Sequence, residues 1–483
     1  MASFVGCADI HVTHATENSA DCQPGSLFAA IAGTQTDGIE FVGEALQHGA
    51  TGLLVARPLA GVSVPQCIVG DIRSAYSTLC HALYGHPSCR LKVCGVTGTN
   101  GKTTVTWLLR SILTVASKRA GLLGTIEYFD GVSKRDASLT TPDSRTLSQW
   151  LQSMVRRGCS HAAMELSSHA LDQGRATGIR LDAAIVTNVT QDHFDYHGDF
   201  ETYQKAKANI FQQCRPGGFV AINADDAGSA ALHGSVPEGL SLRTFGIDGD
   251  ADVRASIVDQ SRLGTRFLVE LNGESIDFET PLVGKHNVSN CLAAISVASH
   301  WGLATDAIVD GIAALNAVPG RLERIDCGQS FDVFVDYAHT DDALKRCVSH
   351  LRQLATGRVI CVFGAGGDRD KLKRPMLGKA AADADVVVVT SDNPRSEEPN
   401  KIIRDILIGF DASKAGPHVE ADRSAAIRWA IDQAEPNDCV LIAGKGHETV
   451  QIIGDERHPF DDRQVARDAL NDRVTLEQRR IGA

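Results

Sequence analysis

The sequence has 483 residues, of which 43% are hydrophobic and 22% are charged, so we expect two to four folded domains with substantial cores. Asp and Glu outnumber Lys and Arg by 59 to 47, and this net charge of −12 argues against a general nucleic-acid binder but not against an anionic substrate held by local cations. No stretch approaches 18 uninterrupted apolar residues and the first residues do not resemble a secretion signal, so we expect a cytoplasmic protein with no membrane insertion.

The first predicted domain spans residues 1–88 and has the character of a short α/β segment. It ends near Tyr84-Gly85-His86-Pro87-Ser88, where a new strand begins. The thirteen cysteines along the whole chain include no Cys-x-x-Cys pair. They indicate neither a disulfide framework nor a zinc ribbon, and we expect most of them to be small buried residues.

The clearest motif opens the second predicted domain, residues 89–318. A predicted strand at 93–97 runs into Gly98-Thr99-Asn100-Gly101-Lys102-Thr103-Thr104, which opens a helix. The glycines let backbone N–H groups approach phosphate oxygens, while Lys102 supplies charge and Thr103 a hydroxyl for Mg²⁺. The general pattern wants glycine at position 96, where this chain has Val96. The segment predicts an ATP-binding loop; the alternative is a glycine-rich turn without a ligand.

Two further polar segments in this domain follow predicted strands. Glu165 ends one strand, and His193 lies in residues 187–198 after another. Both types of side chain can bind Mg²⁺ that bridges ATP phosphates, although a single Glu or His is more often solvated or hydrogen-bonded in a core. Ser167 and His169 do not indicate a hydrolase, because no Gly-x-Ser-x-Gly surrounds them. A helical run is predicted over 290–317, before the break at Val318-Pro319-Gly320.

The third predicted domain spans residues 319–483. Its predicted strands at 332–335, 359–363, 386–390 and 439–443 alternate with helical segments, which is typical of a mostly parallel, helix-covered sheet. Each strand runs into a polar or glycine-rich loop, at 336–339, 364–369, 391–395 and 444–448. Because ligands bind at the carboxyl ends of such strands, the four loops predict one site.

Seven ordered motifs together resemble the Mur ligases, ATP-dependent enzymes that form the amide bonds of the peptidoglycan peptide stem. They are the phosphate loop 98–104, Glu165-Leu166-Ser167-Ser168-His169, Asp192-His193-Phe194-Asp195-Tyr196-His197-Gly198, Tyr203-x-x-Ala206-Lys207, Lys285-His286-Asn287-Val288-Ser289-Asn290, Gly320-Arg321-Leu322-Glu323 and Asp336-Tyr337-Ala338-His339. The resemblance implies an α/β fold in the three-domain Mur ligase architecture, with a uridine-binding domain, a central P-loop ATPase domain and a C-terminal Rossmann-like domain.

The resemblance also implies a mechanism and its residues. ATP phosphorylates a substrate carboxylate, and the amine of an amino acid then attacks the acyl phosphate. We expect catalysis to depend on Mg²⁺, Lys102 and positioning rather than on a protein nucleophile. The implied metal residues are Thr103, Glu165, His193 and Lys207, the last as a carbamate (N6-carboxylysine). Besides residues 98–104, the implied nucleotide contacts are Asn287, Arg321 and Asp336, and this set suggests that domains close over ATP.

The substrate that carries the carboxylate is implied to be UDP-N-acetylmuramoyl-L-alanyl-D-glutamate. Its predicted contacts are Ser26, Thr140, Thr141, Ser167, Gln173 and Arg175, whose hydroxyls and guanidinium suit phosphates and carboxylates. The first domain departs from the family pattern, because Asn18-Ser19-Ala20 stands where the family shows Asp-Ser-Arg. A cation expected near the sugar nucleotide is therefore absent at position 20.

Within the family, Thr140-Thr141-Pro142 and Asp392-Asn393-Pro394-Arg395 resemble the ligases that add meso-2,6-diaminopimelate. A guanidinium at Arg395 can pair with the distal carboxylate of that amino acid and would repel the ammonium of lysine. The full predicted set is Arg369, Asp392, Asn393, Pro394, Arg395, Gly444 and Glu448, with Glu448 suited to an ammonium. We expect a monomer. Alternatives are a sister ligase that adds lysine or a dipeptide, a folylpolyglutamate-type synthetase, or a P-loop switch that needs no amino acid.

Overall fold

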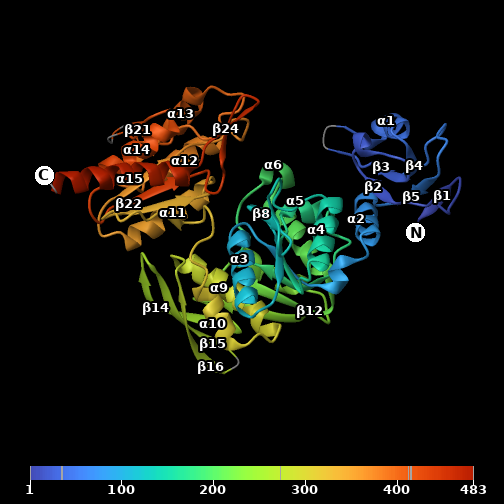
Figure 1. The fold of residues 1–483 in the computed structure, drawn as a ribbon, viewed down its shortest axis with the longest axis horizontal. Helices are drawn as coiled ribbons and strands as arrows, with labels where there is room; N and C mark the ends of the chain where they lie inside the picture. Colours follow the sequence, from blue (N-terminus) through green and yellow to red (C-terminus); the bar gives the residue numbers. More distant parts are fainter. Residues whose placement is uncertain (1, 34–35, 272, 412, 414–415, 482–483) are drawn as a thin grey trace. The chain divides into compact units, whose positions relative to one another are not determined.

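The computed structural model describes residues 2–33, 36–271, 273–411, 413 and 416–481. The chain divides into two compact units. The first comprises Met1–Ser256, Phe267–Phe278 and His286–Ala314, and the second comprises Ile257–Arg266, Glu279–Lys285 and Leu315–Ala483. The described strands form three large sheets, within 3–68, 92–280 and 323–443, and one two-stranded ribbon (Figure 1). The domain limits predicted at residues 88 and 318 stay predictions.

The first sheet has the order β1-β5-β4-β3-β2, with β2 to β5 parallel and β1 antiparallel at one edge. Its strands are β1 (Ser3–Val5), β2 (His14–Thr16), β3 (Ser26–Ala29), β4 (Ala50–Val55) and β5 (Gln66–Ile68), with helices α1 (Val42–Gln47) and α2 (Ile72–Leu83). Alternate strand residues face two separate apolar clusters: Phe28 and Leu53 lie in one, Leu27 and Leu54 in the other. The sheet is therefore covered on both faces, as a small α/β segment requires.

The central sheet has the order β16-β15-β14-β13-β12-β11-β6-β10-β7-β8-β9. Its strands are β6 (Lys92–Thr97), β7 (Ala120–Leu123), β8 (Glu127–Phe129), β9 (Lys134–Asp136), β10 (His161–Glu165), β11 (Leu181–Val186), β12 (Cys214–Asn223), β13 (Ser241–Gly246), β14 (Val253–Ser261), β15 (Gly264–Leu271) and β16 (Glu274–Thr280). Strand β6 lies between β10 and β11, parallel to both. The carboxyl ends of these three strands meet at one edge, which brings the phosphate loop, Glu165 and the 187–198 segment together.

The helices of this region are α3 (Lys102–Val115), α4 (Ser144–Arg156), α5 (Ser168–Asp172), α6 (Phe194–His197), α7 (Phe200–Ala208), α8 (Ala227–Ala230), α9 (Lys285–His300) and α10 (Thr305–Ala313). The single helical run predicted over 290–317 was wrong, because α9 and α10 are separate helices. Gly302, at φ +73°, lies just past the end of α9. Glycine adopts this left-handed backbone without strain, so it ends the helix.

The third sheet has the order β17-β18-β22-β19-β20-β21, and every pair except β17–β18 is parallel. Its strands are β17 (Glu323–Arg324), β18 (Asp332–Asp336), β19 (Val359–Phe363), β20 (Val386–Val389), β21 (His418–Val419) and β22 (Cys439–Ala443), followed by the ribbon β23 (Val450–Ile453) and β24 (Glu456–Pro459). The helices are α11 (Asp341–Leu354), α12 (Lys373–Ala381), α13 (Pro399–Leu407), α14 (Arg423–Gln433) and α15 (Asp462–Ile481). The predicted parallel sheet is confirmed.

Strand alternation explains why helices cover both faces of this sheet. Cys361 and Phe363 of β19 face one apolar cluster, with residues of α11, α12 and α13. Ile360 and Val362 face the other, with residues of α14 and α15. The strands therefore read as continuous apolar runs rather than alternating ones.

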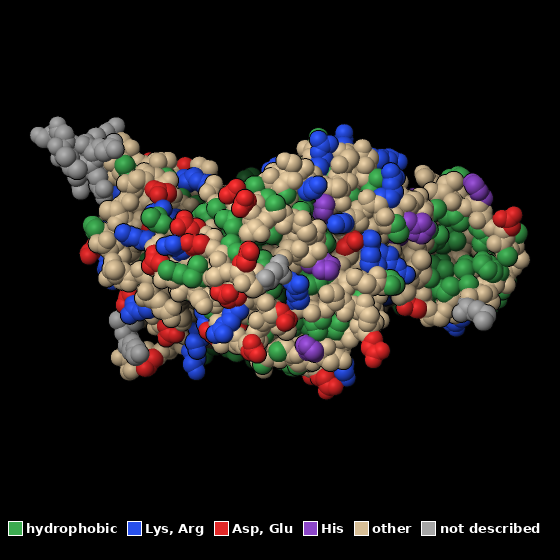
Figure 2. All heavy atoms as spheres, turned by 90° about the horizontal axis from the view of Figure 1, so that it is seen from below, with side chains coloured by type: hydrophobic (Ala, Val, Ile, Leu, Met, Phe, Trp, Pro, Cys, Tyr) green, Lys and Arg blue, Asp and Glu red, His purple; other side chains and the backbone are tan. Residues whose placement is uncertain are grey.

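Three further observations concern the surface, the helices and the cysteines. Lys and Arg side chains are interspersed with Asp and Glu on the face shown in Figure 2. Within the described residues, no helix is long and apolar enough to cross a membrane. All thirteen cysteines are free, and eight of them are buried.

Candidate active site

The phosphate loop between β6 and α3 depends on two glycines with positive φ, +148° at Gly98 and +88° at Gly101. A Cβ atom at Gly98 would strike the Thr187 hydroxyl, and one at Gly101 would strike the Asn290 amide, so side chains are excluded at both positions. Lys102 opens α3 and curls back over the loop, where its ammonium donates to Gly98 O at 2.7 Å. A glycine loop, a helix N-terminus and an ammonium together form an arrangement that binds phosphate oxygens.

The segment after β11 holds the middle of the loop. The N–H groups of Thr99 and Asn100 donate to Asn188 O and Asn188 Oδ1, both at 2.8 Å. The Thr99 hydroxyl also lies 3.1 Å from Tyr203 Oη. Thr104 is buried in the first turn of α3. The predicted residues 98–104 thus form one braced loop, although Thr104 faces the interior.

Glu165 lies beside this loop at the end of β10 and is 1% exposed. Its Oε2 accepts hydrogen bonds from Thr103 Oγ1 at 3.1 Å and Thr125 Oγ1 at 2.8 Å, and its Oε1 accepts one from Thr125 N at 2.8 Å. An ionised carboxylate only accepts hydrogen bonds, so Thr103 gives its hydrogen to Glu165 and presents oxygen lone pairs to a ligand. The predicted metal residues Thr103 and Glu165 are therefore in direct contact.

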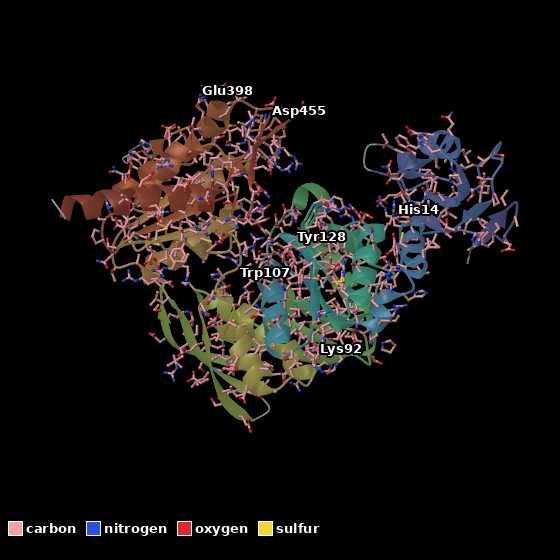
Figure 3. All side chains as sticks on the ribbon, viewed as in Figure 1. His14, Lys92, Trp107, Tyr128, Glu398 and Asp455 are labelled. Carbon is pink, nitrogen blue, oxygen red and sulfur yellow. The ribbon has the colours of Figure 1, made fainter. Side chains whose placement is uncertain are left out.

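The predicted dipeptide contact Thr140 lies close to this carboxylate. Tyr128 of β8 is 1% exposed, and its ring is among the side chains labelled in Figure 3. The Tyr128 hydroxyl donates to Leu139 O at 2.6 Å and accepts from Leu139 N at 3.1 Å. These two hydrogen bonds fix the segment that carries Thr140. The Thr140 hydroxyl lies 3.1 Å from Thr125 Oγ1.

Thr141 and Ser167 form a second contact at the same strand end. Thr141 Oγ1 donates to Glu165 O at 2.8 Å and accepts from Ser167 N at 3.0 Å. The Ser167 hydroxyl caps α5 by accepting from Ala170 N at 3.2 Å. The two predicted dipeptide contacts are therefore adjacent, and each is also tied to the backbone.

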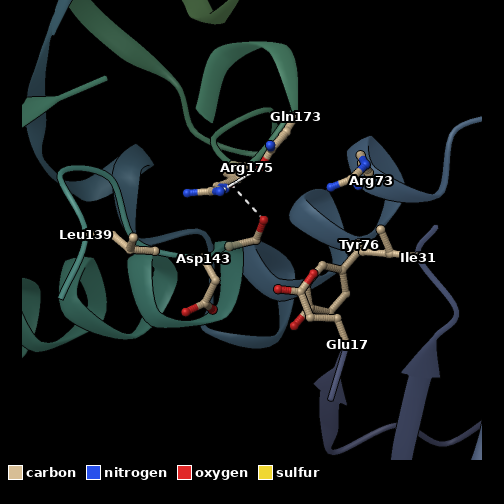
Figure 4. A pocket seen from close by; sticks show the side chains of 9 residues that line it. Glu17, Ile31, Arg73, Tyr76, Leu139, Asp143, Gln173 and Arg175 are labelled. Atoms are coloured by element: carbon tan, nitrogen blue, oxygen red, sulfur yellow. Dashed lines mark hydrogen bonds between the residues drawn. The ribbon is translucent and has the colours of Figure 1, made fainter. Parts of the chain in front are cut away.

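Gln173 and Arg175, the remaining central-domain contacts predicted for the dipeptide, face a hollow of about 140 Å³ (Figure 4). Arg175 donates from Nη2 to Gln173 Oε1 at 2.6 Å and from Nη1 to Thr141 O at 3.2 Å. The hollow is lined by Glu17, Ile31, Arg73, Tyr76, Leu139, Asp143, Ser144, Gln173 and Arg175. It therefore combines the strand ends of the first sheet, α2 and the segments that precede α4 and follow α5.

Glu17 and Arg73 in this hollow were missed by the sequence reasoning. Burial and then Asp143 raise the pKa of Glu17, while Arg175 and Arg73 act in the opposite direction. Arg73 also donates to Ala32 O at 2.6 Å. Neither residue belongs to a sequence motif. Only the packing of the first sheet beside residues 173–175 shows that both line the same hollow.

Ser26, the predicted dipeptide contact in the first sheet, does not line this hollow. It is fully buried at the start of β3. Its hydroxyl accepts from Gln23 N at 2.9 Å. Its role as a substrate contact stays a prediction.

His193 and Lys207, predicted to bind the metal, lie near the phosphate loop. Burial, together with the nearby His169, Lys102 and Lys207, lowers the pKa of His193 to about 4, against the raising effect of Asp192. Lys207 of α7 is 1% exposed, and burial and then Lys102 hold its pKa well below the ordinary value. Its Nζ atom lies 4.3 Å from the centre of the Tyr203 ring. The neutral imidazole suits metal binding.

The predicted nucleotide contacts outside the phosphate loop lie in both units. In the first, Asn287 of α9 is 4% exposed and accepts from Asn290 Nδ2 at 3.1 Å. In the second, the Arg321 guanidinium stacks 4.6 Å from the centre of the Tyr337 ring. Burial raises the pKa of Asp336 although Arg321 and the N–H groups that it accepts from act to lower it.

The four predicted loops of the third sheet do come together. Asn393 Nδ2 donates to Glu448 Oε2 at 2.9 Å. The fully buried Lys445 ammonium joins the same two side chains, at 3.0 Å from Asn393 Oδ1 and 2.9 Å from Glu448 Oε2. The rings of Tyr337 and His447 are 5.0 Å apart. Glu448 was predicted to bind an ammonium of the substrate. In the structure its carboxylate already contacts the ammonium of Lys445.

Arg395 adopts a left-handed backbone, at φ +50°. Its N–H donates to Ile452 O at 3.1 Å, and its Nη1 donates to Gly367 O at 2.7 Å. A Cβ at Gly367 would strike Pro394 O, so this glycine allows the two loops to touch. The guanidinium thus lies over the Gly366-Gly367 turn that leads to Arg369.

The remaining members of the predicted set lie at the neighbouring strand end. A Cβ at Gly444 would come within 2.7 Å of Asp392 Oδ2. Beneath them Arg423, unpredicted, is fully buried and pairs with Asp462 at 2.7 Å. It also donates to Ser391 O at 3.3 Å and Ala443 O at 2.9 Å, and so braces the two strand ends. A lone arginine opening a helix gives no signal of this role in the sequence.

The donor chemistry fits a divalent cation at Thr103 and Glu165, because Mg²⁺ prefers carboxylate and hydroxyl oxygens. Among the residues that the structure describes, no group of three or more His, Cys, Asp and Glu is arranged to hold a metal. Oxygens from a phosphate or from a carbamate on Lys207 would therefore have to complete the shell.

Comparison with known families covers most of the chain. Residues 96–298 match the Mur ligase middle domain, and residues 320–446 match the Mur ligase, glutamate ligase domain. The two matches include the phosphate loop, Glu165 and the four loops of the third sheet, except for residues 447–448.

Individual relatives are similar over nearly their whole length. The chain is 44% identical over 473 residues to the UDP-N-acetylmuramoyl-L-alanyl-D-glutamate--2,6-diaminopimelate ligase of Solibacter usitatus, covering 96% of this chain and 94% of the relative. It is 43% identical over 477 residues to the protein of the same name from Synechococcus elongatus, covering 96% and 95%. A solved structure with that name has a TM-score of 0.69 at 33% identity and covers 96% of this chain and 95% of its own.

Proposed function

This chain belongs to the Mur ligase family, and we propose that it joins meso-2,6-diaminopimelate to UDP-N-acetylmuramoyl-L-alanyl-D-glutamate with the energy of ATP. The product is a peptidoglycan precursor, and the work is done in the cytoplasm. The observation that carries the choice of amino acid is the Arg395 guanidinium, held over the Gly366-Gly367 turn by its hydrogen bond to Gly367 O.

The nucleotide is proposed to bind at the phosphate loop. Lys102 and the loop N–H groups hold the phosphates, and Asn287 contributes from α9. Arg321 and Asp336, in the second unit, are the remaining predicted nucleotide contacts. Thr103, Glu165, His193 and a carbamate on Lys207 would hold Mg²⁺. When bound, this ion neutralises phosphate charge and polarises the transferred phosphoryl group.

The reaction has two steps. The γ-carboxylate of the D-Glu residue attacks the γ-phosphorus of ATP, the bond to the β–γ bridging oxygen breaks, and ADP leaves. The amine of the amino acid then attacks the acyl phosphate carbonyl and forms a tetrahedral intermediate, which expels phosphate as the amine loses its proton. Lys102 stabilises the negative charge that shifts during transfer, and Arg175 and Thr141 position the dipeptide.

Carbamate formation at Lys207 is supported by its burial. The neutral amine attacks CO₂, a carbon–nitrogen bond forms, and one proton is released. A depressed pKa keeps more of the amine neutral. The product carries negative charge beside Lys102, where the ammonium would be repelled.

The amino-acid site is proposed to use the complete set of predicted residues at the loops of the third sheet. Arg395 and Arg369 pair with the distal carboxylate, and Asp392 and Glu448 face the distal ammonium. Asn393 links the loop at 391–395 to the loop at 444–448 through its hydrogen bonds with Glu448 and Lys445. L-Lysine as a substrate would place its side-chain ammonium near Arg395 and has no distal carboxylate to pair with the guanidinium. The two positive charges would repel each other, so lysine fits this site poorly.

The test is phosphate release with the UDP-dipeptide and a panel of amino acids. We expect release that depends on meso-diaminopimelate, with L-lysine and glutamate giving little. Preference for lysine would establish the sister ligase, and preference for glutamate with a folate substrate would establish a synthetase of that type. ATP hydrolysis that needs no amino acid would indicate a switch instead.

A further inference from the structure

Thr125 lies outside the predicted site, yet it contacts two residues of that site. It is in the turn between β7 and β8. Its hydroxyl is 2.8 Å from Glu165 Oε2 and 3.1 Å from Thr140 Oγ1, and its N–H donates to Glu165 Oε1 at 2.8 Å. A Cβ at Gly124 would strike Glu165 Oε1, so this turn is pressed against the carboxylate. One residue thus holds both oxygens of Glu165.

The hydrogen bonds in this cluster have a fixed direction. Because the ionised Glu165 carboxylate has no hydrogen to give, the single hydroxyl hydrogen of Thr125 points to it. The 3.1 Å contact with Thr140 is then a hydrogen bond only if Thr140 donates to Thr125. Thr140 consequently offers oxygen lone pairs to the substrate, which suits an amide N–H or sugar hydroxyl rather than a phosphate or carboxylate.

We propose that Thr125 is a positioning residue that orients Glu165 for the metal–nucleotide complex and Thr140 for the dipeptide substrate. The proposal rests on the proposed function. Because the hydroxyl of Thr125 joins the two sites, its loss should weaken both metal–nucleotide binding and use of the dipeptide. A purely structural threonine would change stability without this pair of effects.

Three variants separate the hydroxyl from the rest of the side chain. Thr125→Val keeps the shape and the backbone N–H but removes the hydroxyl, whereas Thr125→Ser keeps the hydroxyl. Thr106→Val is the control for loss of a threonine hydroxyl in this unit, because Thr106 is fully buried and its hydroxyl donates to a backbone carbonyl, Thr103 O, at 2.9 Å, whereas Thr125 is half-buried. Thermal unfolding of each variant reports on the fold.

The first readout needs no ligation: binding of Mn²⁺ in the presence of ADP, followed by the electron paramagnetic resonance signal of free Mn²⁺. We expect Thr125→Val to weaken this binding about tenfold or more, as loss of a group that orients a metal ligand does. The second readout is the KM for the UDP-dipeptide, expected to rise roughly three- to tenfold for one lost hydrogen bond. Thr125→Ser and Thr106→Val should stay within about twofold of wild type.

Wild-type Mn²⁺ binding and KM in a folded Thr125→Val protein would overturn the proposal, and so would equal losses in Thr125→Ser. If Thr125→Val does not fold, Thr125→Ala decides on the same readouts, because it removes the hydroxyl without adding bulk. A wild-type protein that binds Mn²⁺ and ADP but never ligates diaminopimelate would refute the proposed function and leave the Mn²⁺ comparison of the variants valid.

Discussion

The nucleotide edge of the central sheet and the amino-acid edge of the third sheet both use the carboxyl ends of parallel strands, but they balance charge differently. At the nucleotide edge, the buried carboxylate of Glu165 accepts from neutral donors, Thr103 and Thr125. At the amino-acid edge, buried charges are matched by opposite charges, as in Arg423–Asp462 and Lys445–Glu448.

The difference follows from what each edge is proposed to bind. A nucleotide carries several negative charges and binds together with a metal ion, so hydroxyl groups and cations of the protein are enough to balance its charge. Diaminopimelate carries both signs of charge at each end, so its site needs cations and anions fixed at set distances before it arrives. Three substitutions and an acid titration test this contrast.

The largest effect is expected at the nucleotide edge. Lys102→Ala should lower the rate of ligation by about a thousandfold or more, because it removes the ammonium that stabilises the transferred phosphoryl group. The measurement is kcat for phosphate release, with circular dichroism to confirm the fold. Lys118→Ala, an exposed lysine past the end of α3, is the control. Appreciable turnover in Lys102→Ala would remove this loop from the mechanism.

Lys207→Ala should also lose most activity, because it removes the proposed carbamate. Added acetate or formate should restore part of it by supplying the missing carboxylate. Lys205→Ala is the matched control, since Lys205 lies two residues from Lys207, is exposed and pairs with Glu201. An intact-mass spectrum should show a CO₂ adduct in wild type only. Without rescue and without an adduct, Lys207 has a structural role.

At the amino-acid edge, Arg395→Ala should lower kcat/KM for diaminopimelate by roughly a hundredfold. Loss of one member of a desolvated charged pair costs about 3–5 kcal/mol, reduced here because Arg395 is partly exposed. The KM for the UDP-dipeptide should change little. Discrimination between diaminopimelate and lysine should shrink, because a repulsive cation is removed. The same ratio measured in Arg404→Ala, an exposed arginine of this unit, serves as control, and an unchanged ratio in Arg395→Ala would contradict the assignment.

The smallest expected effect is a difference between the two units in how their stability depends on pH. In the first unit, burial lowers the pKa of His81 and His161 from 6.5 to about 4. Between these two pH values the histidines are protonated in the unfolded chain but neutral in the folded one, so the free energy of unfolding falls as pH drops from 6.5 to 4. We expect about 1–2 kcal/mol per histidine between pH 7 and 5. In the second unit, burial also lowers the pKa of one histidine, His350, so a smaller loss is expected there over the same pH range. Arg374 lowers the pKa of Glu397 from 4.5 to about 2, and that stabilisation is lost only as pH falls through this lower range.

Tryptophan fluorescence can follow the two units in one acid titration. Trp107, Trp150 and Trp301 lie in the first unit and Trp429 in the second, so the difference between wild type and Trp429→Phe isolates the second unit. The first unit should respond at higher pH. A change in the Trp429 signal before the others would contradict the assignment of the histidines.

Much of the candidate site was predictable because its motifs follow strands directly. Glu165 and the loop around Lys102 each come directly after an apolar run, and parallel strand ends meet at one edge. Thr125 was not predictable, since a Gly-Thr turn has no chemical signature and its partner Glu165 is forty residues away. The hollow around Arg73 and Glu17 was missed for the same reason.

The sequence by itself determined the α/β class, the phosphate loop and the four loops of the third sheet, because apolar runs and glycine positions depend on local chemistry. Only the tertiary structure decided the strand order that inserts β22 between β18 and β19. It also decided that Lys445 pairs with Glu448, and that the buried Arg423 pairs with Asp462 and braces two strand ends. Burial and pairing depend on which distant segments pack together, and a linear pattern of residue types carries no record of that packing.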